Sequence, residues 1–277
     1  MNESEIRSKI AEAAKKVRDT KPLAPSITNT VTINFVANAQ LAAGGSAAMV
    51  YLPDEGECVA NIGAAVYINM GTLFPVYAET LPRTVRTLHE LKKKWVLDPV
   101  GIGIGSLRSE LIRGFKHYPP AIIRGNASEI IAVAKLWGIL ADSTSQGPSG
   151  VDSVDDVASA RQAAMFLATF TGGAVAVSGA TDFVTDGKTC AYSEGGSHFM
   201  EKNTGAGCSL GGVCTVFAAV ADPFIAALSA TQLYNLAGKR AEAKSNAPAS
   251  FQVNFIDELY RASPEELAAN PCRFECN

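Results

Sequence analysis

The chain has 277 residues, of which 47% are apolar and 18% are charged, and its formal net charge is −3 at pH 7. A chain of this length buries roughly three quarters of its unfolded surface, so a stable core needs neither disulfides nor a structural metal. The near-neutral charge argues against a nucleic-acid partner, and no run of about 18 apolar residues predicts a membrane span.

The six cysteines and three histidines are scattered and do not follow the spacing of a metal site. No CxxC pair occurs, and Cys272 and Cys276 lie in a polar tail where a chance pair is the simpler interpretation. The first five residues carry acids before any apolar run, unlike a secretory signal. We therefore expect a reduced, cytoplasmic protein that binds neither nucleic acid nor membrane.

The secondary structure begins with a helix, because apolar residues recur at helical spacing from Ile6 to Val17. Asn2 or Ser4 is placed to cap it. After Pro25, short apolar runs alternate with helical segments. The predicted strands are 47–51, 65–69, 95–97, 121–123 and 174–177, and the predicted helices are 57–63, 77–93, 127–137 and 154–169.

The alternation of strands and helices predicts an α/β fold with a mostly parallel sheet and helices on both faces. Right-handed crossovers place the carboxyl ends of all parallel strands at one edge of the sheet, and ligands bind outside that edge. Polar residues that directly follow strands are therefore the first candidates for a functional site.

The second half of the chain carries three further signals. Residues 182–196, with Asp186-Gly187 inside them, predict a hairpin. Residues 209–242 predict two helices separated at Asp222-Pro223, and residues 142–150 predict a surface loop or lid. Without an internal repeat or a long linker, we expect one domain over residues 1–277.

The strongest local motif is the glycine turn from Asn203 to Cys208, directly ahead of an apolar helix. Glycines at a helix N-terminus let backbone N–H groups and the helix dipole face an anion, as a transferred phosphoryl group requires. In that position the pKa of the Cys208 thiol is expected to be lowered. A tight turn with a buried structural cysteine is an equally weighted interpretation.

Two predicted strands end in charged residues. Asp98 follows the strand 95–97, where it either holds Mg²⁺ or caps the next segment. Arg124 follows the strand 121–123 and suits bidentate phosphate binding. Asn126 and Glu129 form either a capping box or, through Glu129, part of a magnesium site.

Two nucleotide-binding motifs fail on their spacing. Gly101, Gly103 and Gly105 follow G-x-G-x-G rather than the dinucleotide fingerprint. Lys188 lies in a Gly-Lys-Thr triplet, but Asp182 stands where a P-loop needs its first glycine. A kinase built on this sequence is therefore not a P-loop kinase.

Seven blocks, in this order and spacing, make the chain similar to hydroxyethylthiazole kinases along nearly its whole length. They are SITNTVTINFVAN (26–38), INMGTL (68–73), VLDPVGIG (96–103), IRGNASE (123–129), GVDS (150–153), TGAGC (204–208) and PASF (248–251). The polar tail at about 262–277 lies outside the resemblance.

The resemblance implies a ribokinase-like three-layer α/β/α fold and a homotrimer with active sites at subunit interfaces. It implies phosphorylation of the hydroxyl of 4-methyl-5-(2-hydroxyethyl)thiazole by ATP and Mg²⁺, for thiamine biosynthesis or salvage. The roles that it implies are these: Met49, Gly205 and Asn29 contact the alcohol; Arg124, Ser178 and Asn126 bind ATP; Asp98 and Glu129 organise Mg²⁺; Gly205, Ala206, Gly207 and Cys208 form the catalytic turn.

Some positions depart from the family pattern. Ser178 replaces the usual threonine but keeps the hydroxyl, and Ala206 replaces a threonine within the glycine turn. The acidic segment 54–57, close to Met49, is less regular than its equivalent. Two other functions remain open: a kinase of a different small alcohol, such as a hydroxymethylpyrimidine, or a hydrolase with Cys208 as nucleophile and His198 as its base.

Overall fold

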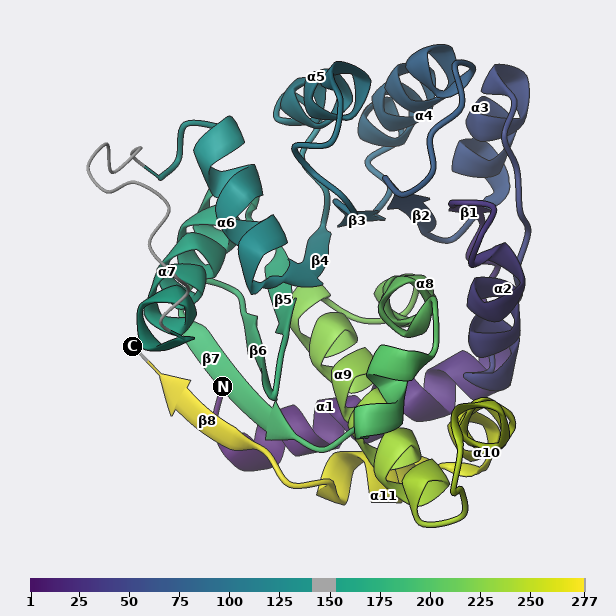
Figure 1. Ribbon diagram of the computed structural model, residues 1–277, viewed down its shortest axis with the longest axis vertical. Helices are drawn as coiled ribbons and strands as arrows, with labels where there is room; N and C mark the ends of the chain where they lie inside the picture. The colour runs from purple at the N-terminus through teal and green to yellow at the C-terminus, as the bar shows by residue number, and fades with distance from the viewer. Residues whose placement is uncertain (141–152, 277) are drawn as a thin grey trace.

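The computed structural model describes residues 1–140 and 153–276, and the predicted loop at 142–150 lies outside the described residues. One eight-stranded sheet runs through the molecule in the order β1-β2-β3-β4-β5-β6-β7-β8 (Figure 1). Its strands are β1 (Ser26–Ile27), β2 (Val66–Asn69), β3 (Trp95–Asp98), β4 (Ile122–Asn126), β5 (Ala174–Ser178), β6 (Thr181–Thr185), β7 (Thr189–Glu194) and β8 (Arg273–Cys276).

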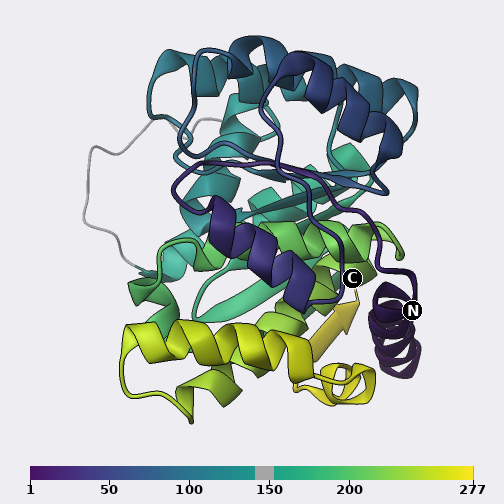
Figure 2. The same cartoon turned by 90° about the vertical axis from the view of Figure 1, so that its right-hand side faces the viewer.

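The helices fall into two layers that cover the two faces of the sheet. One layer holds α3 (Pro53–Ile62), α4 (Tyr77–Glu90), α5 (Ser106–Phe115), α6 (Ala127–Leu136) and α7 (Ser153–Thr171). The other holds α1 (Glu3–Thr20), α2 (Ile33–Ala42), α8 (Ala206–Ala218), α9 (Pro223–Glu242), α10 (Pro248–Arg261) and α11 (Pro264–Ala269). Figure 2 shows α3–α5 above the sheet and the C-terminal helices below it.

Strand order explains this division. β1 to β5 are parallel and follow one another in sequence order. Right-handed crossovers between parallel strands that always advance in one direction place their helices on the same face. The opposite face is covered by α1, by α2, which lies with α3 in the connection from β1 to β2, and by α8 to α11, which follow the antiparallel strands β6 and β7. The predicted three-layer α/β/α fold is confirmed.

The central strands are apolar because both faces are covered. Every residue of β2 and β3 is buried, as parallel strands between two helix layers require. Their side chains alternate between the two layers: Tyr67 and Val96 pack with α8, while Ile68 and Leu97 pack with α3 to α7. Two hydrophobic cores result, one on each side of the sheet.

The first helix shows how the sequence sets an element's boundary. Asn2 accepts a hydrogen bond from the backbone N–H of Glu5 at 2.9 Å, and the Glu5 carboxylate accepts one from the Asn2 N–H at 3.0 Å. A cap of this kind stabilises a helix by ~1 kcal/mol. Of the two predicted caps, Asn2 is the one observed.

One sequence-based expectation about the sheet is wrong, and one strand was not predicted. Residues 47–51 form no strand; Met49 makes only an isolated bridge to Ser26, and the edge strand is β1 instead. The polar tail adds a strand, because β8 pairs antiparallel with β7. Its apolar residue Phe274 packs on the core beneath the guanidinium of Arg7, 5.7 Å from the ring centre.

No helix in the described part of the chain combines the length and apolarity that crossing a membrane requires.

Close packing between α8 and β2 leads to a testable prediction. A Cβ atom added at Gly211 in α8 would lie 2.5 Å from Cε2 of the buried Tyr67 ring. We expect Gly211→Ala to lower the free energy of unfolding by ~1–3 kcal/mol, as overpacking does. Denaturant unfolding followed by circular dichroism measures this loss.

The matched control is Gly114→Ala on the exposed side of α5, where an added Cβ meets no atom of the described residues within 4 Å. This substitution should raise the free energy of unfolding by roughly 0.5 kcal/mol, since alanine loses less backbone entropy than glycine. Equal effects at the two positions would contradict the packing described here.

Candidate active site

Four parallel strands bring polar side chains to one edge of the sheet, on the face covered by α8. Asn69 ends β2 in register with Asp98 at the end of β3. Ser178 ends β5 in register with Asn126, and Arg124 lies two residues earlier on β4. Because side chains alternate along a strand, Asp98 shares the face of Val96, and Arg124 shares the face of Ile122; both apolar residues pack with α8.

Asp98 and Arg124 form a buried pair of opposite charges. Asp98 Oδ2 lies 3.5 Å from Arg124 Nη1, and the two side chains are 0% and 8% exposed, respectively. Burial raises the pKa of Asp98 from 3.8 to about 6, although the Arg124 charge opposes that rise. Burial alone would lower the pKa of Arg124, but the charge of Asp98 outweighs it and the pKa is raised.

The hydrogen-bond donors around Asp98 converge on a single oxygen. Oδ2 accepts from the Tyr67 hydroxyl at 2.8 Å and from the Asn69 amide at 3.1 Å, in addition to Arg124. Oδ1 is buried and has no hydrogen-bond partner among the described residues. A buried carboxylate oxygen without a donor is costly and suits a cation ligand.

Glu129 and Asn126 form a capping box, which was one of the two roles that the sequence left open for them. The Asn126 side chain accepts from the Glu129 N–H, and Glu129 Oε2 accepts from the Asn126 N–H, both at 2.9 Å. The Glu129 charge still contributes to the raised pKa of Asp98. The carboxylate therefore starts α6 and adds negative potential next to Asp98.

Within residues 1–140 and 153–276, no group of three or more His, Cys, Asp or Glu side chains is arranged to hold a metal ion. Asp98 Oδ1 and the nearby Glu129 charge nevertheless fit Mg²⁺, which is commonly bound by one or two carboxylates together with phosphate oxygens and water.

The predicted glycine turn lies against the buried pair. Gly205 has a φ of +95°, a left-handed conformation that favours glycine, and α8 begins at the next residue. A Cβ at Gly207 would lie 2.8 Å from Nη1 of Arg124. The absence of a side chain at Gly207 thus lets the start of α8 touch the guanidinium, so the helix dipole and Arg124 face the same space.

The pKa of the Cys208 thiol differs from the sequence-based expectation. Its pKa is raised, first by burial and then by the Asp98 charge, whereas the sequence predicted a lowered pKa at a helix N-terminus. The Asn29 amide approaches its sulfur at 3.6 Å. Desolvation and a carboxylate outweigh the helix dipole here, so the thiol is neutral near pH 7.

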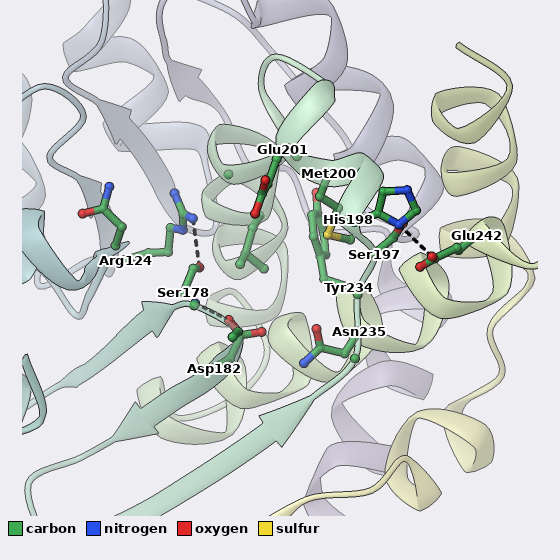
Figure 3. Close-up of a pocket in the computed structure, with 18 residues that line it drawn as sticks. Arg124, Ser178, Asp182, Ser197, His198, Met200, Glu201, Tyr234, Asn235 and Glu242 are labelled. Carbon is green, nitrogen blue, oxygen red and sulfur yellow. Dashed lines mark hydrogen bonds and ion pairs between the residues drawn. The ribbon is translucent and has the colours of Figure 1, made fainter. Parts of the chain in front are cut away.

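A pocket of ≈ 720 Å³ opens beside this turn (Figure 3). Of the predicted site residues, those lining it are Arg124, Asn126, Ser178, Ala206 and Gly207. Arg124 Nη2 donates to the Ser178 hydroxyl at 2.9 Å, as Figure 3 shows. On the opposite side of the pocket, His198 contacts Glu242 at 2.8 Å rather than a cysteine.

The other predicted residues lie outside this pocket's lining. Asn29 hydrogen-bonds Asn69 at 2.9 Å and contacts Cys208, while Met49 bridges Ser26, three residues before Asn29. A Cβ at Gly205 would lie 2.9 Å from Thr32 of the same segment. The structure thus assembles Asn29, Cys208 and Gly205 around the start of α8.

Sequence reasoning missed two residues of the site, Tyr67 and Asn69. Asn69 could have been found, because it is a polar residue at the end of a predicted strand. Tyr67 could not, because an aromatic residue inside an apolar strand is typical of a core position. Asp182 was also overlooked as a pocket residue; its carboxylate accepts from the Gly179 N–H at 3.0 Å and shapes the turn after β5.

Comparison with known proteins gives consistent matches. The model of the hydroxyethylthiazole kinase family matches residues 14–265. A hydroxyethylthiazole kinase from Bifidobacterium longum is 51% identical, over 96% of this chain and 90% of that protein. The structure of a hydroxyethylthiazole kinase protein from Pyrococcus horikoshii OT3 superposes with a TM-score of 0.84 at 31% identity, covering 96% of this chain and 98% of that one. A ribokinase-like superfamily protein from Enterococcus faecalis V583, 13% identical with a TM-score of 0.58 and 86% of each chain covered, shares the fold.

The raised pKa of Asp98 predicts how stability depends on pH in the metal-free protein. Between pH 4 and 6 the folded state holds a proton on Asp98 that the unfolded state has released, so the contribution of Asp98 to the free energy of unfolding falls as pH rises. The Asp98→Asn side chain does not titrate, so this pH-dependent contribution is absent from the variant. Its stability relative to the native protein should therefore increase by about 1–3 kcal/mol over that range.

Urea unfolding in a chelator at several pH values tests this, with Asp19→Asn, which removes an exposed carboxylate, as the matched control. A stability difference between Asp98→Asn and the native protein that stays constant from pH 4 to 6 would contradict the raised pKa.

Proposed function

We infer that this chain, which belongs to the hydroxyethylthiazole kinase family, transfers the γ-phosphoryl group of ATP to the hydroxyl of 4-methyl-5-(2-hydroxyethyl)thiazole. The observation that carries this function is the buried pair of Asp98 and Arg124, placed against the glycine turn that starts α8. A phosphoryl-transfer site needs positive charge, helix dipoles and a metal-binding carboxylate at one point, and this edge of the sheet supplies all three.

The phosphates of ATP are assigned to the pocket beside α8. Arg124 is oriented by the Ser178 hydroxyl and presents its guanidinium at the pocket wall next to Gly207. The first turn of α8 adds its dipole. Together with Asn126, these groups bind and orient the phosphate chain, and the cationic guanidinium stabilises negative charge that spreads over the transferred oxygens.

We assign Mg²⁺ to Asp98, with Glu129 close enough to add its charge. The support is Oδ1 of Asp98, which has no partner among the residues described, while the three donors on Oδ2 hold the carboxylate in one orientation. When bound, Mg²⁺ supplies charge neutralisation between phosphate oxygens. The protein's part is to hold the carboxylate still.

The alcohol is assigned to the other side of the α8 start, next to Asn29, Met49 and Gly205. Cys208 lies there with a neutral thiol, which is a poor base at pH 7. A loose transition state makes little demand on a base. We therefore assign Cys208 to positioning the hydroxyl for in-line attack, within the turn formed by Gly205, Ala206 and Gly207.

We further propose a homotrimer in which a neighbouring subunit completes the alcohol site. Large apolar side chains are exposed close to the assigned residues: Val31 at 67%, two residues from Asn29, and Leu52 at 50%, three residues from Met49. Ile104, in the loop after Asp98, is 70% exposed. We also propose that residues 1–277 form a single domain, which the one continuous sheet supports. We propose a cytoplasmic location as well.

The cysteine-hydrolase alternative has little support from the structure. Its base would be His198, whose ring bonds Glu242 instead, and its nucleophile would need a lowered thiol pKa rather than the raised one. A kinase acting on a different small alcohol remains the second candidate, because the segment beside Met49 departs from the family pattern.

The direct test is phosphoryl transfer from ATP with Mg²⁺ to the thiazole alcohol, compared with hydroxymethylpyrimidine, pyridoxal and ribose. We expect the thiazole alcohol to have the highest kcat/KM. Cys208→Ala should slow turnover by about 10-fold without abolishing it, because the thiol positions rather than reacts. Preference for another alcohol would overturn the substrate, and transfer to none would overturn the function.

Arg124→Ala should lower kcat by about 10²–10³-fold, since it removes a preorganised charge from the transition state. The matched control is Arg113→Ala on the exposed side of α5, which should keep the native rate. Similar losses in both variants would show that net charge, rather than the placement of Arg124, supports catalysis.

The trimer is tested by sedimentation equilibrium, which should give about three times the chain mass of 29.0 kDa. Val31→Lys should weaken the assembly, because it places charge in an apolar contact. A monomeric native protein at micromolar concentration would contradict the shared site.

A further inference from the structure

Tyr67 stands between the two halves of the assigned site. Its ring is fully buried on β2, and its hydroxyl lies 2.8 Å from Asp98 Oδ2 and 2.7 Å from the backbone carbonyl oxygen of Cys208. The Asn69 amide donates to the same hydroxyl at 2.9 Å. One side-chain oxygen thus contacts the carboxylate at the sheet edge, the first turn of α8 and the last residue of β2.

The ring itself is fixed by α8. A Cβ at Gly211 would lie 2.5 Å from Tyr67 Cε2 and 2.6 Å from its hydroxyl oxygen, so only glycine lets the helix rest on the ring. Packing therefore sets where the hydroxyl lies before any hydrogen bond is made. A side chain held in this way orients its partners without loss of rotamer freedom.

The hydroxyl contacts decide which way Asp98 faces. Tyr67 and Asn69 both donate to Oδ2, and Arg124 approaches the same atom, so Oδ1 has no partner in the part of the chain that the structure describes. An ionised carboxylate accepts stronger hydrogen bonds than a carbonyl. The Tyr67 hydroxyl has one proton and two acceptors within hydrogen-bond distance, Asp98 Oδ2 at 2.8 Å and the Cys208 carbonyl oxygen at 2.7 Å, so the proton is shared between the carboxylate and the first turn of α8.

We propose that Tyr67 is a positioning residue for phosphoryl transfer, whose hydroxyl fixes the Asp98 carboxylate at a constant separation from the start of α8. The proposal rests on the proposed function, because it assigns Asp98 to the metal and the start of α8 to the phosphates. Without the hydroxyl, Asp98 Oδ2 keeps only the Asn69 amide at 3.1 Å and the longer Arg124 contact at 3.5 Å, so the orientation of the carboxylate is held less firmly. Tyr67 acts through Asp98 and touches no substrate.

The test is Tyr67→Phe, which keeps the ring against Gly211 and removes only the hydroxyl. The first readout is binding of ADP by calorimetry, with and without Mg²⁺. We expect affinity for ADP with Mg²⁺ to fall about 10-fold, as for loss of a hydrogen bond to a charged group, and affinity for ADP in a chelator to change less than about 3-fold. A merely structural role would weaken both alike.

The second readout is kinetic. Tyr67→Phe should lower kcat for the thiazole alcohol by about 10-fold while its KM stays within about 2-fold, because it removes no side chain that is assigned to the alcohol. In the double variant, adding Tyr67→Phe to Asp98→Asn should lower kcat by less than about 2-fold further. The two residues are in contact, so the effects of the two substitutions are coupled.

The matched control is Tyr192→Phe. Its hydroxyl also bonds a carboxylate, Glu275 Oε2 at 3.0 Å, but lies on β7 beside β8 rather than in the site. It should leave nucleotide binding and kcat unchanged. If Tyr67→Phe fails to fold, Asn69→Ala, which removes another donor to Oδ2, replaces it and should show the same selective loss for ADP with Mg²⁺.

The proposal is overturned if the folded variant binds ADP with Mg²⁺ as the native protein does, or if the losses from Tyr67→Phe and Asp98→Asn simply multiply. A native protein that phosphorylates none of the alcohols would overturn the proposed function instead. The calorimetric comparison would still decide the role of Tyr67 in that case.

Discussion

The buried contact between Asp98 and Arg124 is the interaction on which the rest of the site depends. Two charges removed from water attract each other across 3.5 Å, a long contact for an ion pair. Within residues 1–140 and 153–276, Arg124 Nε and Asp98 Oδ1 have no hydrogen-bond partner. Such a pair contributes little stability, because desolvation offsets the attraction. Its unused donors and acceptors are suited to a ligand, so binding of phosphate and metal would complete what folding leaves unsatisfied.

The fold supplies this pair through strand order and small residues. Sequential parallel strands bring Asn69, Asp98 and Ser178 to a single edge, and α3 to α7 from the connections between them occupy one face. The other face is open to α8, which approaches closely because Gly207 meets Arg124 and Gly211 meets Tyr67. A larger side chain at either glycine would move the helix N-terminus away from the carboxylate. The glycine turn and the sheet edge are therefore one structural unit.

Local patterns in the sequence were enough to predict much of this arrangement. The alternation of strands and helices predicted the parallel sheet, and Asp98 and Arg124 were found because charged residues at strand ends must meet at one edge. Tyr67 was not found, since its role depends on a glycine 144 positions later in α8 and is invisible in the pattern of β2. Residues 47–51 have strand-like composition but bridge only Ser26 near the edge. The tail strand β8 has too little apolar alternation to be recognised without its partner β7.

Burial explains the remaining differences. The sequence places Cys208 at a helix N-terminus, which lowers a thiol pKa, but distant elements bury it next to Asp98 and raise that pKa instead. Glu129 was ambiguous for a similar reason, because a capping box and a nearby negative charge require the same residues at the same spacing. Tertiary contacts, and not the motif, decide between such roles.

The central claim is that the orientation of Asp98 serves phosphoryl transfer rather than folding. Initial rates of ATP-dependent phosphorylation of the thiazole alcohol, measured over a range of Mg²⁺ concentrations for the native protein and for Asp98→Asn, test it most directly. The account predicts a folded variant whose rate at saturating Mg²⁺ is lower by about 10²-fold or more, and which needs more Mg²⁺ to reach half its maximum. A folded variant with a native rate and a native Mg²⁺ requirement would contradict it.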